Sequence, residues 1–173
     1  MSIIIRKETT EDVNVVDHVV KKAFENAEHS DHDEHHLVNR LRKSSKFIPE
    51  LSLVAEYNGN VVGHILFTEI KVGDDTLIAL APLAVLPEMQ NKGIGKLLIM
   101  EGHKIASQLG YKGSVVLGHE TYYPKFGYKK ASQYSIKAPF EVPDENFMAL
   151  ELKDGGLSEV HGIVEYANEF FPQ

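Results

Sequence analysis

The sequence contains no cysteine among its 173 residues. It can therefore form no disulfide framework and no thiolate metal site, and it has no cysteine nucleophile. No apolar run approaches the roughly 20 residues that a membrane-spanning helix needs, and the first residues lack the layout of a signal peptide. We therefore expect a cytoplasmic protein with no membrane partner.

Basic residues are also in short supply, with 18 Lys and Arg against 25 Asp and Glu, which gives a formal net charge of −7. This balance argues against nucleic acid as the main partner. It would suit a cationic or amine substrate, although many proteins carry such a charge for solubility alone. A hydrophobic content of 43% and a charged content of 25% are ordinary for a globular chain.

The first fifty residues predict one strand and two helices. The β-branched run Ile3–Arg6 is typical of a strand, and Thr9 or Thr10 is placed to cap a helix with a stripe of valines. Asp31 followed by Glu34 resembles a capping box, which predicts a second helix to about Arg42.

Three antiparallel strands are expected next, at Ser52–Tyr57, Val61–Val72 and Thr76–Leu86. Asn58-Gly59 is a strong hairpin signal, and Gly63 indicates a bulge or a close backbone contact. Period-two alternation assigns the second strand's side chains to two faces: Val62, His64, Leu66, Thr68 and Ile70 on one, and Val61, Ile65, Phe67 and Glu69 on the other.

The chain centres on a strand, a glycine-bearing loop and a helix. Leu80–Leu86 is an apolar run of strand length, Pro87–Gly95 is polar and holds a Gly-x-Gly pair, and helical spacing begins at Ile94. A helix start that follows such a loop is a physical phosphate site, since its N–H groups lack acceptors and the dipole favours anions. Lys92 and Lys96 would add positive charge.

A second strand of the same kind, Ser114–Leu117, follows this helix and is expected to lie parallel to Leu80–Leu86. Gly118–Tyr123 then leaves its carboxyl end, where open α/β sheets bind ligands. Further strands are expected near the C-terminus, at Tyr134–Ala138, Phe147–Leu152 and Gly162–Ala167.

Two motifs carry a resemblance to a known family. The string from Gln90 to Gly95 follows a Leu-Ala-Val-x-Pro strand end and resembles the Gln/Arg-x-x-Gly-x-Gly/Ala loop of the GNAT superfamily of N-acetyltransferases. Tyr123 to Tyr128 resembles that family's Tyr-x-x-x-Gly-Phe/Tyr segment. The resemblance covers roughly residues 3–130.

The resemblance implies an α/β (α+β) fold. Its central sheet is mixed and mostly antiparallel, with one splayed parallel strand pair and helices on both faces. We expect residues 1–173 to form a single N-acetyltransferase domain, with 131–173 as a strand-rich extension of it. Pro82 and Pro87 are compatible with a local disruption of the ladder at the splay.

The resemblance also implies acetyl-CoA as cosubstrate. Backbone N–H groups of the loop would hold the pyrophosphate, and the pantetheine arm would lie along the preceding strand. The cofactor-binding residues expected on this basis are Leu83, Ala84, Val85, Gln90, Asn91, Lys92, Gly93, Ile94, Gly95, Lys96, Tyr123 and Phe126.

The implied reaction is direct attack of a primary amine on the thioester, through a tetrahedral intermediate. Tyr123 is expected as the general acid for the leaving thiolate, whereas Tyr122 is expected to point elsewhere. The general base stays open, and the candidates are Glu69, His119, Glu56 and Glu120.

Four histidines, at positions 29, 32, 35 and 36, leave alternatives open. His32, His35 and His36 would lie near one another on the second helix and could form a solvated face, a wall of the acceptor pocket or a metal site. No metal motif is present, and no metal is expected. The competing functions are a non-catalytic acyl-CoA sensor and a histidine-cluster metal-binding protein. A homodimer is possible.

Overall fold

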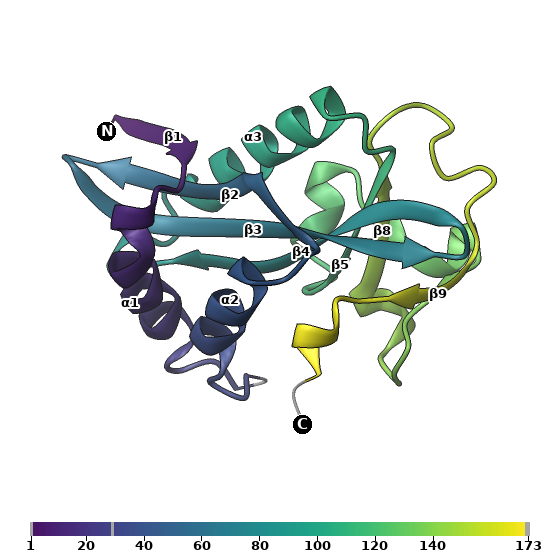
Figure 1. Cartoon of the computed structure of the whole chain (residues 1–173), viewed down its shortest axis with the longest axis horizontal. Coiled ribbons are helices and arrows are strands. Elements are labelled where there is room, and N and C mark those ends of the chain that lie inside the picture. The colour runs from purple at the N-terminus through teal and green to yellow at the C-terminus, as the bar shows by residue number, and fades with distance from the viewer. Residues whose placement is uncertain (1, 29, 172–173) are drawn as a thin grey trace.

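The computed structural model describes residues 2–28 and 30–171 and places a mixed β-sheet between helices on both faces (Figure 1). Its main strands are β1 (Ile3–Lys7), β2 (Phe47–Tyr57), β3 (Asn60–Val72), β4 (Asp75–Val85), β5 (Gly113–Leu117), β8 (Phe147–Glu151) and β9 (Gly162–Glu165), with two-residue strands β6 (Lys129–Lys130) and β7 (Ile136–Lys137). The helices are α1 (Val13–Phe24), α2 (Glu34–Arg42) and α3 (Ile94–Gln108). This arrangement confirms the predicted fold class.

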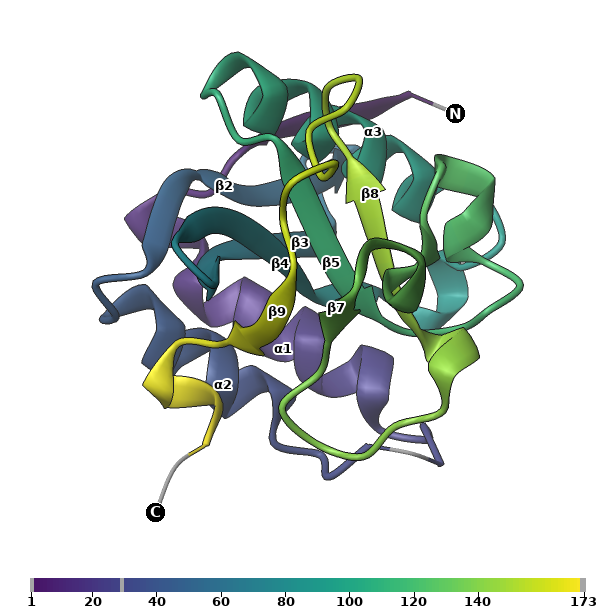
Figure 2. The ribbon, with the colours of Figure 1, turned by 90° about the vertical axis from the view of Figure 1, so that its right-hand side faces the viewer.

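The sheet order is β1-β2-β3-β4-β5-β8-β6, with β9 hydrogen-bonded to β3 and β7. Strands β1 to β4 are antiparallel neighbours, and β4 and β5 form the expected parallel pair. Helix α3 lies on one face, and α1 and α2 lie on the other (Figure 2). Within the described ranges, no helix is both long and apolar enough to cross a membrane.

Helix α3 covers its face of the sheet through a buried cluster that includes Leu53, Ile65, Phe67 and Leu98. Gly63 allows this close approach, because a Cβ built on it would lie 3.2 Å from side-chain carbons of Ile94 and of Leu98. The sequence prediction of a close backbone contact at Gly63 is confirmed.

The opposite face is covered by α1 and α2, whose valines and Leu41 pack on Val54 and Leu66. The predicted face assignment is wrong at the start of β3. Val61 packs with the α1–α2 cluster and Val62 with the α3 cluster. A register shift between Ala55 and Glu56 of β2 is the reason, since an extra residue at a β-bulge exchanges the faces of the residues before it.

The C-terminal segment extends the same sheet. Strand β8 pairs along the outer edge of β5, and β9 pairs with the end of β3 at Val72. The strand predicted at Tyr134–Ala138 shortens to β7, because residues 131–134 form a 3₁₀ turn and Ser135 has a positive φ of 58°. The predicted ends at Leu152 and Ala167 fall just beyond β8 and β9.

Candidate active site

The parallel pair β4–β5 separates at its carboxyl end. Its register runs from Ile78 opposite Ser114 to Leu80 opposite Val116, and there it stops. Beyond this point Leu83 to Val85 continue to pair with β3 alone. A register shift between β3 and β4 falls opposite Ala81 and Pro82, as expected for a proline that interrupts a ladder. The splay therefore leaves backbone groups of β4 available to a ligand.

The loop after β4 turns sharply into α3. Asn91 and Gly93 have positive φ values of 61° and 82°, and Gly93 is the residue before the first helical turn. The Gln90 side-chain amide donates to the Val85 carbonyl at 3.1 Å and ties the loop to the strand end. The N–H groups of the first turn have no intrahelical acceptor and point at the loop, which makes this helix start an anion site.

A groove of about 400 Å³ lies between the strand end and the helix start. We call it the β4–α3 groove, and it is lined by Leu83, Val85, Met89, Gln90, Asn91, Gly93, Ile94, Gly95, Lys96, Tyr122, Lys125 and Phe126. Most of the predicted cofactor residues line it. Ala84 does not, because it faces the α1–α2 side and is 1% exposed, and Lys92 and Tyr123 are also absent from the lining.

Sequence reasoning missed Met89, Tyr122 and Lys125 as groove residues. Tyr122 was expected to point elsewhere, yet a Cβ on Gly95 would lie 2.7 Å from the Tyr122 hydroxyl. Lys125 Nζ lies 5.8 Å from the centre of the Tyr122 ring, so it adds positive charge over the groove. The short 3₁₀ turn at Tyr123–Phe126 explains the change, because it directs the residue before it toward α3.

Tyr123 packs at the carboxyl end of β5. A Cβ on Gly118 would lie 2.3 Å from the Tyr123 ring, so only glycine admits the ring there. The ring meets those of Tyr122 and Tyr128 edge to face, at centroid distances of 5.1 Å and 5.8 Å. Burial raises the pKa of Tyr123 above its usual range, so its hydroxyl holds its proton at neutral pH.

A buried hydrogen-bond chain holds Tyr128 next to Tyr123. The Tyr128 hydroxyl lies 2.9 Å from Nε2 of His103 and 2.9 Å from Oγ of Ser114. Burial lowers the pKa of His103 to about 4, so its imidazole is neutral and one ring nitrogen can accept. These hydrogen bonds link α3 to β5 next to the Tyr123 ring.

The candidate bases lie in different places. Glu69 accepts a hydrogen bond of 2.6 Å from the Tyr111 hydroxyl, beyond the C-terminal end of α3 and on the α3 face of the sheet. Glu56 forms an ion pair with Arg6, two strands away from β4. The structure brings neither of them to the splay.

His119 and Glu120 follow the end of β5. The His119 side chain is 78% exposed, with Nδ1 3.8 Å from the Glu120 carboxylate. The Asn146 amide donates to that carboxylate at 2.7 Å, and the pKa of Glu120 is lowered by a backbone hydrogen bond and by this amide. Both residues lie at the carboxyl end of β5, but neither lines the β4–α3 groove.

A second cavity, of about 380 Å³, lies on the face of the sheet that carries α2. We call it the α2–β5 cavity. Its floor is formed by the diverging ends of β4 and β5, and it is lined by Asp31, Asp33, Glu34, Leu37, Arg40, Ala79, Leu80, Ala81, Val115, Val116, Leu117, Phe140, Tyr166, Phe170 and Phe171. No local sequence pattern predicts this cavity, because its lining residues come from five segments that are distant along the chain.

The histidine-rich segment does not form a cluster on one helix. Helix α2 begins at Glu34, whereas His32 lies before it with a φ of 59° and places Nδ1 3.0 Å from the Phe24 carbonyl oxygen. The rings of His35 and His36 have centroids 4.0 Å apart and are tilted by 37°. His29 lies outside the described residues. Among the residues that are described, no set of three or more His, Asp and Glu side chains is arranged to hold a metal ion.

Comparisons with known proteins agree with this geometry. The model of the acetyltransferase (GNAT) family matches residues 15–128. The chain is 30% identical to the uncharacterized N-acetyltransferase YhbS of Escherichia coli over 96% of this chain and 98% of that protein. It is 40% identical to the uncharacterized N-acetyltransferase YjhQ of the same organism, over 64% of each chain.

Two solved structures have the same architecture along nearly the whole chain. A crystal structure of E. coli YhbS in complex with CoA superposes with a TM-score of 0.89 at 29% identity, covering 98% of this chain and 92% of the other. A GNAT family acetyltransferase from Brucella melitensis in complex with acetyl-CoA gives a TM-score of 0.81 at 32% identity, covering 98% of each chain. With the splayed strands, the glycine loop and these matches together, the chain belongs to the acetyltransferase (GNAT) family.

Proposed function

We propose that this protein transfers the acetyl group of acetyl-CoA to a primary amine by direct attack on the thioester. The observation that carries the proposal is the continuity between the β4–α3 groove and the splayed strands, since Leu83 and Val85 line the groove and lie just beyond the last β4–β5 pair. A cytoplasmic location, where acetyl-CoA is available, is part of the proposal.

In this scheme the groove holds the cofactor. The N–H groups at the start of α3 bind the pyrophosphate, with Lys96 and Lys125 adding charge at the groove wall. The pantetheine arm lies along Leu83 to Val85 in place of a neighbouring strand. A backbone N–H of this segment then donates to the thioester oxygen as it gains charge.

The bound ammonium group first gives one proton to the base through water, and the neutral amine nitrogen then attacks the carbonyl carbon and forms a tetrahedral intermediate. Its collapse breaks the C–S bond, and the sulfur leaves with the electron pair. Tyr123 gives its proton to that sulfur, and the protonated product nitrogen loses one proton to water. The Tyr123 ring lies at Gly118, directly after β5, which supports this role because the thioester would reach the same strand end.

The general base in this scheme comes from the residues that follow β5. His119 is the sequence candidate at the carboxyl end of β5, and its exposed imidazole would act through water. Glu69 is left out of the proposed site, because its carboxylate lies on the α3 face whereas the α2–β5 cavity lies on the other.

Thermal unfolding with increasing acetyl-CoA is the first test. A ligand at about 100 times its dissociation constant adds about 2.7 kcal/mol, which is several degrees for a chain of this size. We expect a saturable rise in Tm with acetyl-CoA and none with acetyl phosphate. Absence of a shift at millimolar acetyl-CoA would overturn the proposal.

Tyr123→Phe separates an enzyme from a non-catalytic sensor. We expect kcat for acetyl transfer to fall by about 100-fold, the size typical of a lost general acid, with unchanged acetyl-CoA affinity. Tyr57→Phe is the matched control, and its kcat should stay within about threefold of the wild type, since Tyr57 lies at the end of β2 and does not line the β4–α3 groove. Equal kcat values for the two variants would remove Tyr123 from the mechanism.

A further inference from the structure

The α2–β5 cavity lies where an acceptor would meet the cofactor. Ala79 to Ala81 of β4 and Val115 to Leu117 of β5 form its floor, which spans the last two β4–β5 pairs and the residues just beyond them, where the two strands separate. The β4–α3 groove begins two residues further along β4, at Leu83. A molecule in the cavity therefore reaches the thioester end of a cofactor bound in the groove.

One wall of the cavity is aromatic. Phe140 stacks on Tyr166 with ring centroids 6.0 Å apart and planes at 17°, and Phe170 meets Tyr166 at 5.1 Å. Phe171 lies 6.2 Å from the same ring. Phe140 is 38% exposed and Phe171 is 53% exposed, so the wall offers apolar surface that a ligand would cover.

A second wall, at the start of α2, is acidic. It carries three acidic residues, Asp31, Asp33 and Glu34, and one basic residue, Arg40. Arg40 is already engaged, since its guanidinium lies 3.0 Å from the Asp33 carboxylate and donates to the Glu169 carbonyl at 3.1 Å. Two carboxylates are left without a cationic partner among the described residues.

Glu34 is the less exposed of these two carboxylates. The Ser30 hydroxyl donates to its Oε2, whereas its Oε1 is buried and has no hydrogen-bond partner among the described residues. A buried carboxylate oxygen without a partner favours a nearby cationic donor. The wall therefore attracts ammonium groups and repels carboxylates.

We infer that the α2–β5 cavity selects a small primary amine carried on an aromatic or apolar body and bearing no carboxylate. This inference rests on the proposed function. Aromatic rings attract cations through their faces, and the negative charge of the acidic wall also attracts cations. The volume of about 380 Å³ is in the range of small-molecule pockets.

The test compares acceptors that differ in one feature each. 2-Phenylethylamine carries the ring and the amine, phenylalanine adds a carboxylate to it, and ethanolamine lacks the ring. Release of the CoA thiol gives kcat/KM for each with the full chain. We expect 2-phenylethylamine to exceed both others by about tenfold or more, which corresponds to about 1.4 kcal/mol for each feature.

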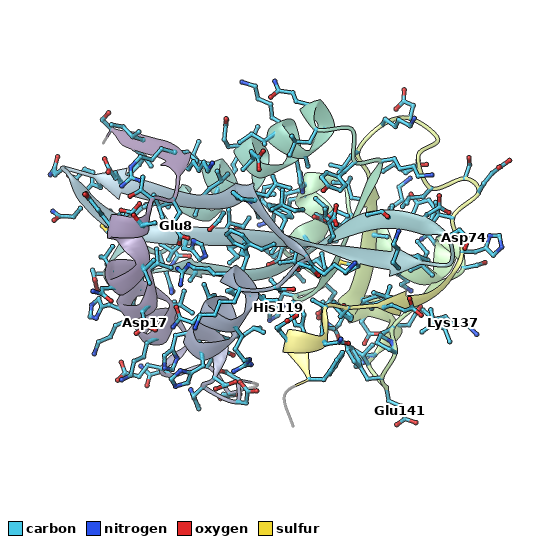
Figure 3. All side chains as sticks on the ribbon, in the orientation of Figure 1. Glu8, Asp17, Asp74, His119, Lys137 and Glu141 are labelled. Atoms are coloured by element: carbon cyan, nitrogen blue, oxygen red, sulfur yellow. The ribbon has the colours of Figure 1, made fainter. Side chains whose placement is uncertain are left out.

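Matched variants assign the preference to the two walls. Glu34→Gln keeps the size and the hydrogen bond of the side chain and should raise KM for 2-phenylethylamine about fivefold while kcat holds, with weaker dependence on salt. Phe140→Leu should raise the same KM about threefold. Glu141→Gln is the control, because this neighbouring carboxylate points away from the molecule (Figure 3) and does not line the cavity.

The outcomes separate this inference from the function beneath it. If acetyl-CoA is bound and transferred but phenylalanine or ethanolamine is preferred, the inference fails and the acetyltransferase proposal stands. If acetyl-CoA is bound and no amine is acetylated, calorimetric titration of 2-phenylethylamine into the CoA complex decides, and no heat at millimolar amine overturns the inference. If acetyl-CoA itself does not bind, the function fails.

Discussion

The β4–α3 groove and the α2–β5 cavity adjoin along one strand and are built in opposite ways. The groove is formed by two short segments, residues 83–96 and 122–126, and the anion site that we propose in it consists of backbone N–H groups. The cavity is formed by side chains from segments as distant as Asp31 and Phe171. A backbone site depends on a few glycines, whereas a side-chain site depends on each residue of its walls.

This difference predicts where substitutions act. A change at the helix start should alter cofactor binding and leave the choice of amine intact. A change in the aromatic or acidic wall should do the reverse.

Gly95→Asp should abolish useful cofactor binding. Asp is favourable in the first turn of a helix, so α3 should form. A Cβ at this position lies 2.7 Å from the Tyr122 hydroxyl and must displace it, so Gly95→Asn, of the same size and without the charge, is the control for side-chain size. A carboxylate there would face the pyrophosphate, and two like charges about 4 Å apart cost about 4 kcal/mol at the effective dielectric of a protein surface. We expect acetyl-CoA to bind about 1000-fold more weakly by calorimetry.

Gly102→Ala in the same helix is the matched control for Gly95→Asp. Its Cβ would lie 2.4 Å from the Phe67 ring, so it should lower Tm through core strain and keep the cofactor affinity of the folded protein. If Gly95→Asp bound acetyl-CoA normally, the anion site would not lie at this helix start.

Acid should lower the free energy of unfolding, because one buried histidine lies on each face of the sheet. Burial lowers the pKa of His64, on the α1–α2 side, to about 4, and the pKa of His103, on α3, to about 4 as well. The unfolded chain, with pKa values near 6.5, then binds more protons than the folded one between pH 6.5 and 4. Stability is complete above this window and falls as the pH drops through it.

The expected loss at pH 5 is about 2 kcal/mol for each histidine. Urea unfolding at pH 7 and pH 5 measures it, and the ring C–H signals of both histidines should titrate near pH 4. His103→Gln should reduce the loss of unfolding free energy between pH 7 and pH 5 by the part due to His103. His161→Gln, at an exposed position, should leave that loss unchanged. A flat stability curve between pH 7 and pH 5 would contradict the burial argument.

Phe140→Ala should have the smallest effect of these substitutions on acetyl-CoA affinity. Phe140 lies in the cavity wall and is absent from the β4–α3 groove. We expect acetyl-CoA affinity within about twofold of the wild type, since substitutions that share no partner are independent. A tenfold loss of cofactor affinity would show that the two sites are coupled.

Local patterns explain what the sequence predicted well. The Asn58-Gly59 turn, the Gly93 and Gly95 loop and the helix after Ile94 follow from short-range backbone chemistry, and each lies where expected. The close contact at Gly63 could be predicted for the same reason, because a glycine in an apolar strand often marks a close approach to the backbone.

The remaining features depend on tertiary contacts. The exchange of Val61 and Val62 between faces comes from a bulge that only strand pairing reveals. Tyr122 and Tyr123 are adjacent, and a single 3₁₀ turn decides which of them enters the groove. The aromatic wall joins Phe140 to Tyr166 and Phe170, and no pattern in the sequence links those positions.

The path of the last strand has a practical consequence. Strand β9 leads the chain back to the α2 side, where Phe171 lines the cavity, whereas β1 lies on the far edge of the sheet (Figure 1). An affinity tag or a surface linker on the carboxyl-terminal side would begin close to Phe171, which lines the α2–β5 cavity, and would compete with the amine that we propose to bind there. Purification and immobilisation for activity assays should therefore use the amino-terminal side.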